Sequence, residues 1–204
     1  MSPTVFLLTV SGLLLASPTD ARGWFMPITD SYTQPGFNAS QFAGKWHLIA
    51  IAATCAELSE SYRKSDGVSI VVSVNQTTPQ GSLLVDTYYP MQMFCWNIKQ
   101  IYLPTNAPGK FLLKGSNPPM HVFVSETDYS TYAIVYYQSF KGVAVKIYGR
   151  TRRLDDNITD RFDLEARDLG LRGPNEVYYW HRYGFCQSAF RFRTLDETDL
   201  LDES

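Results

Sequence analysis

The chain has 204 residues, the length of one ordinary domain, and its hydrophobic content of 45% is enough for a packed core, which excludes a disordered chain. The formal net charge is −2, so no overall excess of basic residues points to nucleic acid or to an anionic membrane. Aromatic residues make up 14% of the chain, and these residue types favour β-strands.

The beginning of the chain is typical of an export signal. Residues 5–16 form an apolar run that is too short to cross a bilayer, and residues suited to cleavage follow it before Arg22. No Lys or Arg precedes the run, and a short buried strand is the alternative interpretation. We predict a signal peptide over residues 1–21 and therefore a secreted, extracellular protein. Residues 22–39 are rich in Pro, Gly and polar side chains, which predicts an irregular arm.

Strand signals then recur at short spacing, separated by turn residues. Apolar and polar residues alternate along them, so each strand has one face toward a core and one toward solvent. The eight predicted strands cover residues 46–53, 68–74, 82–88, 95–102, 110–113, 120–125, 132–138 and 143–148. Eight antiparallel neighbours can close into a barrel, which removes the exposed edges. Periodicity alone leaves a barrel and a sandwich both open.

The pattern changes to a helical period after the last of these strands. Four apolar residues recur at i, i+4, i+8 and i+11: Ile158, Phe162, Ala166 and Leu169. This spacing predicts one amphipathic helix, with Asn157 as its cap and Gly170 as its stop. A last short strand is predicted over residues 177–180, and residues 191–204 are predicted to form an acidic C-terminal tail.

Three glycosylation sequons and three cysteines bear on the compartment. The sequons begin at Asn38, Asn75 and Asn157, which is consistent with export. In an oxidising compartment, three cysteines leave one over after pairing. Such a cysteine indicates a bond to another chain or a reactive thiol.

Other candidate chemistry is sparse. The three histidines, His47, His121 and His181, are scattered without the spacing of metal ligands. Arg150, Arg152 and Arg153 are interpreted as a solvated rim rather than an anion site. The sequence contains no Gly-rich phosphate loop and no nucleophile elbow. We therefore expect no metal, no cofactor and no catalytic residue, and hence no enzyme activity.

Three short motifs decide between barrel and sandwich. They are a Gly-x-Trp on the first strand, a Thr-Asp-Tyr turn and an Arg after the eighth strand, formed here by Gly44, Trp46, Thr127, Asp128, Tyr129 and Arg150. Together, and in this order, they resemble the signature of the lipocalin family. The resemblance implies an all-β fold over residues 40–190: an eight-stranded antiparallel up-and-down barrel with one C-terminal α-helix.

The signature residues are expected to have structural roles. An indole and a guanidinium can stack, and an arginine can donate hydrogen bonds to several carbonyls at once. In lipocalins the residues that match Trp46 and Arg150 meet at the closed end of the barrel. Asp128 lies in a predicted tight turn, where its side chain is expected to accept hydrogen bonds from nearby backbone amides.

A lipocalin barrel of this size holds either packed side chains or one small ligand. Apolar residues of shared parity on three predicted strands are expected to face its interior. They are Val68, Ile70, Val72, Val74, Trp96, Ile98, Val143, Val145 and Ile147. A pocket lined in this way favours an elongated or flat apolar ligand over a charged one.

Within the family, five segments resemble the branch whose members are subunits of the complement system. They are residues 49–60, 94–102, 121–137, 145–154 and 183–197. This resemblance implies that Cys55 forms a disulfide to the alpha chain of complement component eight, while Cys95 pairs with Cys186 internally. It also implies indirect association with the beta chain and the terminal complement proteins of the membrane attack complex, in plasma and without direct membrane insertion.

Two alternatives belong to other functional classes. The first is a carrier of small hydrophobic ligands or haem that resembles alpha-1-microglobulin, which also has an unpaired cysteine after its first strand. The second is an enzyme that resembles lipocalin-type prostaglandin D synthase. That enzyme needs a cysteine on its second strand, and residues 68–74 contain none. The tail after Cys186 favours the complement subunit over the carrier.

Overall fold

The computed structural model describes most of the predicted barrel and the helix that follows it. The described residues are 28–54, 65, 67–76, 81–91, 94–173, 176–180, 186 and 191–195. The predicted signal peptide, Cys55 and His181 lie outside them.

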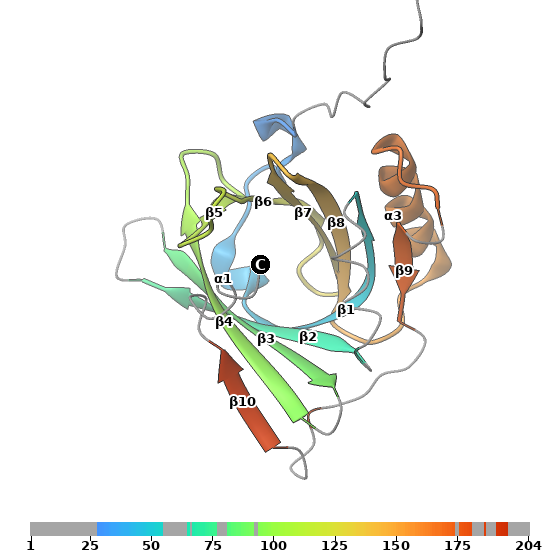
Figure 1. The fold of residues 1–204 in the computed structure, drawn as a ribbon. Helices are drawn as coiled ribbons and strands as arrows, with labels where there is room; N and C mark the ends of the chain where they lie inside the picture. The colour runs from blue at the N-terminus through green and yellow to red at the C-terminus, as the bar shows by residue number, and fades with distance from the viewer. Residues whose placement is uncertain are drawn as a thin grey trace, which may run out of the picture.

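Eight of the described strands form one antiparallel barrel (Figure 1). They are β1 Gly44–Ala53, β2 Val68–Asn75, β3 Ser82–Met91, β4 Phe94–Pro104, β5 Lys110–Leu113, β6 His121–Thr127, β7 Tyr132–Ser139 and β8 Gly142–Gly149. Each strand pairs with the next along the chain, and β1 also pairs with β8, so the ring is complete. The structure thus confirms the predicted eight-stranded up-and-down barrel, because a sandwich would leave edges unpaired.

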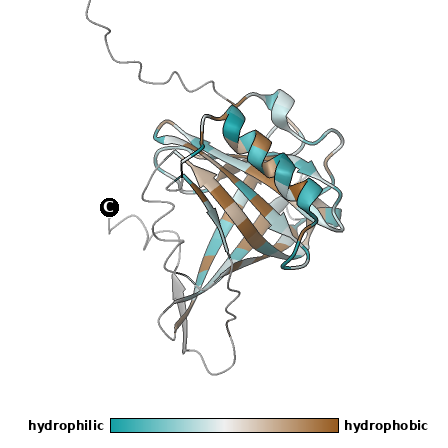
Figure 2. Ribbon diagram, turned by 90° about the vertical axis from the view of Figure 1, so that its right-hand side faces the viewer, coloured by the Kyte–Doolittle hydropathy of each residue, from teal (hydrophilic) through white to brown (hydrophobic). Residues whose placement is uncertain are grey.

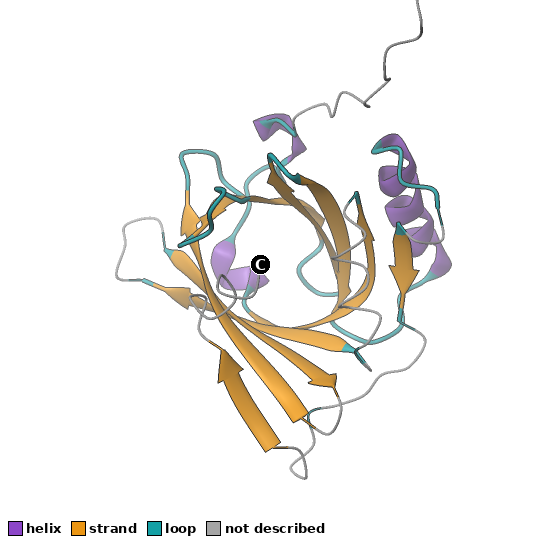
Figure 3. Cartoon of the chain, viewed as in Figure 1, coloured by secondary structure: helices purple, strands orange, loops and turns teal. Residues whose placement is uncertain are grey.

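Helix α1, Ala39–Phe42, occupies one end of the barrel and not the other. It leads into β1 and lies within the ring of strands (Figure 3), and its residue Phe42 is buried in the core. We call this end, where β1 begins and β8 ends, the closed end. The opposite end, where β1 ends and β8 begins, is called the far end.

Strand β1 contains one irregularity in its pairing with β8. The register shifts between Leu48 and Ala50, so Ile49 is an extra residue, as in a β-bulge. Trp46, Leu48 and Ile51 contribute to the core inside the barrel, whereas Ile49 and Ala50 both belong to the core outside it.

Helix α3, Asp156–Asp168, packs against the outside of the barrel (Figure 2). Phe162 and Ala166 are buried there, and Ile158 and Leu169 pack beside them, which confirms the predicted apolar face. The predicted cap is wrong, because Asp155 is the N-cap and Asn157 lies inside the first turn. At the other end Gly170 follows the helix with a φ of 79°, the left-handed conformation that glycine adopts without strain.

The side chains of β8 are buried on both faces, and this overturns part of the predicted cavity lining. Val143, Val145 and Ile147 pack in the cluster that contains Phe162, so they face α3 and not the interior. Apolar residues at alternate positions show that one face of a strand is buried, but not by what. On β8 they lie on the outer face, which α3 buries. The interior positions of β8 are therefore Ala144, Lys146 and Tyr148, of which Tyr148 belongs to the interior cluster.

The other predicted lining residues lie on the interior side of their strands. Val68, Ile70 and Val72 belong to the interior cluster, and Val74 packs against it. Trp96 and Ile98 share the parity of Tyr102, an interior residue of β4, and both are half-buried.

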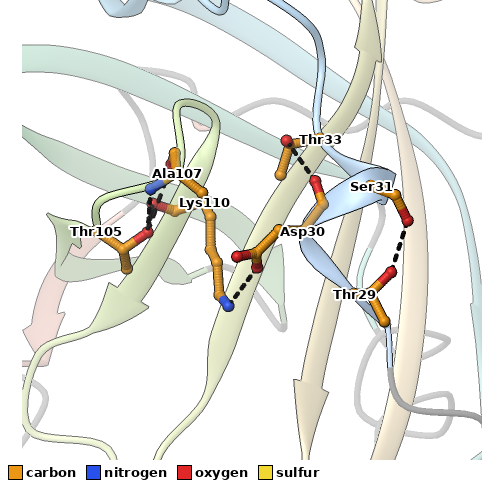
Figure 4. Close-up of polar contacts among 7 residues, drawn as sticks. All are labelled: Thr29, Asp30, Ser31, Thr33, Thr105, Ala107 and Lys110. Carbon is orange, nitrogen blue, oxygen red and sulfur yellow. Dashed lines mark hydrogen bonds and ion pairs between the residues drawn. The ribbon is translucent and has the colours of Figure 1, made fainter.

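A segment before the barrel is tied to β5 by polar contacts. This segment contains the 3₁₀ helix η1, Asp30–Tyr32. The carboxylate of Asp30 accepts a hydrogen bond from Lys110 Nζ at 2.6 Å, and Thr105 Oγ1 donates to the carbonyl of Lys110 (Figure 4). The predicted irregular arm therefore ends in an ordered segment along the barrel wall.

Two further strands follow the helix. Strand β9, Val177–Tyr179, pairs antiparallel with the last part of β1, and β10, Arg191–Leu195, pairs in parallel with the first part of β4. The sequence did not predict β10. A disulfide between Cys95 and Cys186 joins β4 to the segment that leads to β10, with 5.2 Å between the two Cα atoms.

Replacing Cys95 and Cys186 together by Ala is expected to lower the free energy of unfolding by about 2–5 kcal/mol. The bond closes a loop with a sequence separation of 91, and its loss gives the unfolded chain more conformations. Urea unfolding followed by tryptophan fluorescence measures the effect, with Cys55→Ala as the control. Equal unfolding midpoints for the double variant and the wild type would show that the bond does not stabilise the fold.

Candidate functional site

The guanidinium of Arg150 holds the closed end together. It lies 3.6 Å from the centre of the Trp46 ring. Its nitrogens donate hydrogen bonds to four backbone carbonyls, those of Gln41, Ala43, Lys45 and Tyr129, at 2.9–3.1 Å. Only a planar group with several donors can stack and bond in this way, so the residue acts structurally.

Glycine is required beside this guanidinium. Gly44 has a φ of 101°, and a Cβ added there would lie 3.1 Å from a guanidinium nitrogen of Arg150. The Gly-x-Trp motif therefore has two purposes: Gly44 leaves room for the guanidinium, and Trp46 provides the surface on which it stacks.

The Thr-Asp-Tyr turn between β6 and β7 is built around one carboxylate. Asp128 Oδ1 accepts hydrogen bonds from the backbone amides of Ser130, Thr131 and Tyr132 at 2.7–3.1 Å. Burial raises the pKa of Asp128, but these hydrogen bonds outweigh it and hold the pKa below its ordinary value. Tyr129 adopts a φ of 64° in this turn, and its carbonyl accepts from Arg150.

The barrel interior contains a narrow pocket of about 10 Å³. Ile70 and Val72 line it together with aliphatic residues of β3, β6 and β7. Five aromatic side chains complete the lining: Phe42, Tyr102, Phe111, Tyr137 and Tyr148. A space of this size holds roughly one water molecule. At this level of the barrel, side chains occupy the interior, and a ligand has to displace them.

Polar groups are embedded in this apolar lining. The hydroxyls of Tyr137 and Tyr148 lie 3.2 Å apart, and the Tyr102 hydroxyl donates to that of Tyr137 at 3.4 Å. Lys146 is only 9% exposed, and its Nζ lies 4.2 Å from the centre of the Tyr137 ring. Such a cluster can orient the polar end of a mainly apolar ligand.

Sequence analysis did not identify Lys146 as an interior residue. It lies between Val145 and Ile147, and a lysine between two apolar residues is ordinarily on the solvent side of a strand. The long apolar face of the predicted helix could have revealed the position of Lys146. That face must pack against apolar side chains on the outside of a strand, and if Val145 and Ile147 supply them, Lys146 points inward.

The chain just before Cys55 is anchored at the far end of the barrel. Thr54 donates from its backbone nitrogen and its hydroxyl to the carbonyl of Val143, at 3.0 and 3.2 Å. The hydroxyl in turn accepts from the Val143 amide at 3.1 Å. This arrangement fixes where the segment with Cys55 leaves the barrel.

The histidines that the structure describes do not form a metal site. His47 and His121 lie on different strands, and among the described residues no group of three His, Cys, Asp or Glu side chains could hold a metal ion. In the same part of the chain, no helix has the length and hydrophobicity needed to cross a membrane. Arg150 is engaged at the closed end as described, while Arg153 is exposed.

Comparison with known proteins gives a consistent result. The model of the lipocalin / cytosolic fatty-acid binding protein family matches residues 43–179. The chain is 33% identical over 176 residues to the complement component C8 gamma chain of Oryctolagus cuniculus, covering 84% of each chain.

More distant similarity extends to other lipocalins. The chain is 27% identical over 164 residues to the neutrophil gelatinase-associated lipocalin of Rattus norvegicus, covering 74% of this chain and 79% of that one. It is also 27% identical over 181 residues to Protein AMBP of Mesocricetus auratus, covering 85% of this chain and 51% of that protein. This chain thus spans about half of the length of Protein AMBP.

Arg150→Lys is expected to lower the free energy of unfolding by about 2–4 kcal/mol, because an ammonium cannot bond four carbonyls and stack as a plane. Urea unfolding measures the change. Arg153→Lys, at an exposed position, is the matched control and should change stability by less than about 0.5 kcal/mol. A similarly small effect for Arg150→Lys would contradict the role assigned to the guanidinium.

His47 is expected to make the protein less stable in mild acid. Burial, together with the charges of Lys45 and Arg152, lowers the pKa of His47 from 6.5 to about 4. The unfolded chain therefore binds a proton that the folded chain does not, and His47 reduces stability as the pH falls from 6.5 to about 4.

Urea unfolding between pH 7 and pH 4.5 tests this linkage. His47→Gln should reduce the loss of stability with acid. Identical pH dependence in the wild type and in His47→Gln would show that this group is not responsible.

Proposed function

The chain belongs to the lipocalin / cytosolic fatty-acid binding protein family, and from that premise we propose that it is a non-catalytic secreted subunit bound through Cys55 to the alpha chain of complement component eight. Through that chain it would associate with the beta chain and the terminal complement proteins of the membrane attack complex. The similarity to the complement component C8 gamma chain along 84% of both lengths supports this proposal.

The observation that carries the proposal is the internal disulfide. The chain has three cysteines, and the bond between Cys95 and Cys186 uses two of them. Cys55 is the cysteine that this bond leaves over. In an oxidising compartment a leftover cysteine commonly bonds to another chain. The bond that ties β4 to the C-terminal segment therefore leaves Cys55 available to a partner.

The position of Thr54 is compatible with this bond. The residue directly before Cys55 is anchored to Val143 at the far end, where one chain can reach another without breaking a strand pair of the barrel. Because a disulfide requires close Cα atoms, the two proteins must first dock by non-covalent contacts.

A non-catalytic role is supported by the groups in the interior. The polar side chains around the described pocket are phenols and one ammonium, and no carboxylate or imidazole belongs to the lining. General acid–base catalysis at neutral pH most often uses an imidazole or a carboxylate beside the substrate. The arrangement is better suited to binding than to proton transfer.

The proposal includes a small apolar ligand in the barrel, and the alternative function is a free carrier with a reactive thiol. The pocket opposes a resident ligand under either function, because a volume of about 10 Å³ is far below the roughly 300–1,000 Å³ of ordinary ligand sites, and the carrier depends on such a ligand whereas the subunit does not. A ligand would have to move aromatic side chains such as Tyr148 aside.

Cys55→Ala is expected to abolish the covalent species without unfolding the barrel. Cells that secrete this chain together with the complement component eight alpha chain should yield a disulfide-linked pair on a non-reducing gel. The variant should yield none, yet it should still co-purify with the alpha chain, because docking precedes bond formation.

Ser59→Ala, four residues further along, is the matched control and should leave the covalent pair intact. Secretion of the wild type as a free monomer with one titratable thiol, despite the presence of the alpha chain, would refute the subunit function and favour the carrier.

A further inference from the structure

The three N-glycosylation sequons have no part in the function proposed above, yet the fold gathers them at one place. They are Asn38-Ala39-Ser40, Asn75-Gln76-Thr77 and Asn157-Ile158-Thr159. Their acceptor residues lie far apart in the sequence and belong to three different elements, α1, β2 and α3.

Asn38 is at the closed end because it caps α1. Its side-chain oxygen Oδ1 accepts a hydrogen bond from the Gln41 amide at 3.1 Å, and its backbone amide donates to the Tyr129 hydroxyl at 3.0 Å. The residue is exposed. A glycan attaches to the nitrogen Nδ2 and not to Oδ1, so the cap and a glycan are compatible.

Asn75 extends past the beginning of β1. In the β1–β2 pair Val72 lies opposite Gly44, the first residue of β1, and Asn75 follows three residues later as the last residue of β2. It pairs there with Ser82, the first residue of β3. Asn75, the last residue of β2, therefore lies at the closed end.

Asn157 is exposed in the first turn of α3, and that turn also lies toward the closed end. The direction of the helix follows from its contacts with β7, which begins at the closed end. Arg161 donates to the hydroxyl of Tyr132, the first residue of β7, whereas Glu165 accepts from the hydroxyl of Tyr136, four residues further along. The helix therefore runs from the closed end toward the far end.

At the far end, the turn between β7 and β8 presents an apolar side chain and no sequon. Phe140, in the turn between β7 and β8, is 83% exposed, the highest value among the large hydrophobic side chains that the structure describes as exposed. No sequon lies in the segment that joins β7 to β8. A glycan is bulky and strongly solvated, so it keeps other proteins away from the surface around its asparagine.

We propose that Asn38, Asn75 and Asn157 carry N-linked oligosaccharides and that these glycans together cover the closed end of the barrel. The far end, with Phe140, is then the bare end of the molecule, and partner proteins are excluded from the closed end. The arrangement requires no change in the fold, because Arg150 already satisfies the backbone carbonyls under the glycans.

Occupancy is tested on the full chain secreted from mammalian cells. Partial digestion with an N-glycosidase should reveal three steps in gel mobility. Ser40→Ala, Thr77→Ala and Thr159→Ala should each remove one step, and each keeps its asparagine, so that the α1 cap is preserved. Fewer than three steps in the wild type would overturn the proposal.

Coverage of the closed end is tested with a bulky amine-reactive label. Lys45 is exposed at the closed end, and Lys141 is exposed beside Phe140 at the far end. In the variant that combines all three substitutions, Lys45 should react several-fold faster than in the wild type, whereas Lys141 should react at an unchanged rate. Circular dichroism verifies that the variant is folded. Equal labelling of Lys45 in both proteins would show that the glycans do not cover this end.

Discussion

The arrangement of the closed end depends on the guanidinium of Arg150, which bonds to segments that are distant in sequence. It joins the end of β8 to the carbonyls of α1, of the start of β1 and of the β6–β7 turn, and it stacks on Trp46. Without it, these carbonyls would lose the one donor group that also links their segments to one another. Phe42 of α1, the helix whose end Arg150 bonds, lines the small interior pocket together with Phe111.

The outside of the barrel is held by a second type of contact, between phenols and carboxylates. Tyr136 bonds to Glu165 and Tyr179 bonds to Asp163, so both phenols are tied to α3. Burial, and then the adjacent carboxylate, raises the pKa of both tyrosines well above 10. These phenols therefore stay protonated and keep donating at any physiological pH, and the apolar residues beneath α3 remain covered.

Much of this structure was predictable, because strand periodicity, turn residues and the helical repeat are local signals. Strand β5, for example, has the predicted bounds of 110–113. The inner and outer faces of β8 could not be told apart, because both are buried and only the packing of α3 decides between Val145 and Lys146. Strand β10 pairs with β4 over a long sequence separation, and no local pattern encodes such a pairing. The N-cap of α3 differs from the predicted one because Asp155, and not Asn157, has the extended backbone that an N-cap requires.

The extra residue in β1 has a consequence for how chains of this kind diverge. Ile49 reverses the alternation of the strand, so that Leu48 and Ile51 both face the interior although three positions separate them. Loss of one residue at Ile49 would straighten the strand and leave both neighbours on their own sides. Loss of Ala50 would have the same effect, because Ile49 and Ala50 both lie outside, whereas a loss far from the bulge would exchange inner for outer side chains along part of the strand. A one-residue gap along this strand in an alignment of relatives is therefore expected at the bulge, at Ile49 or Ala50.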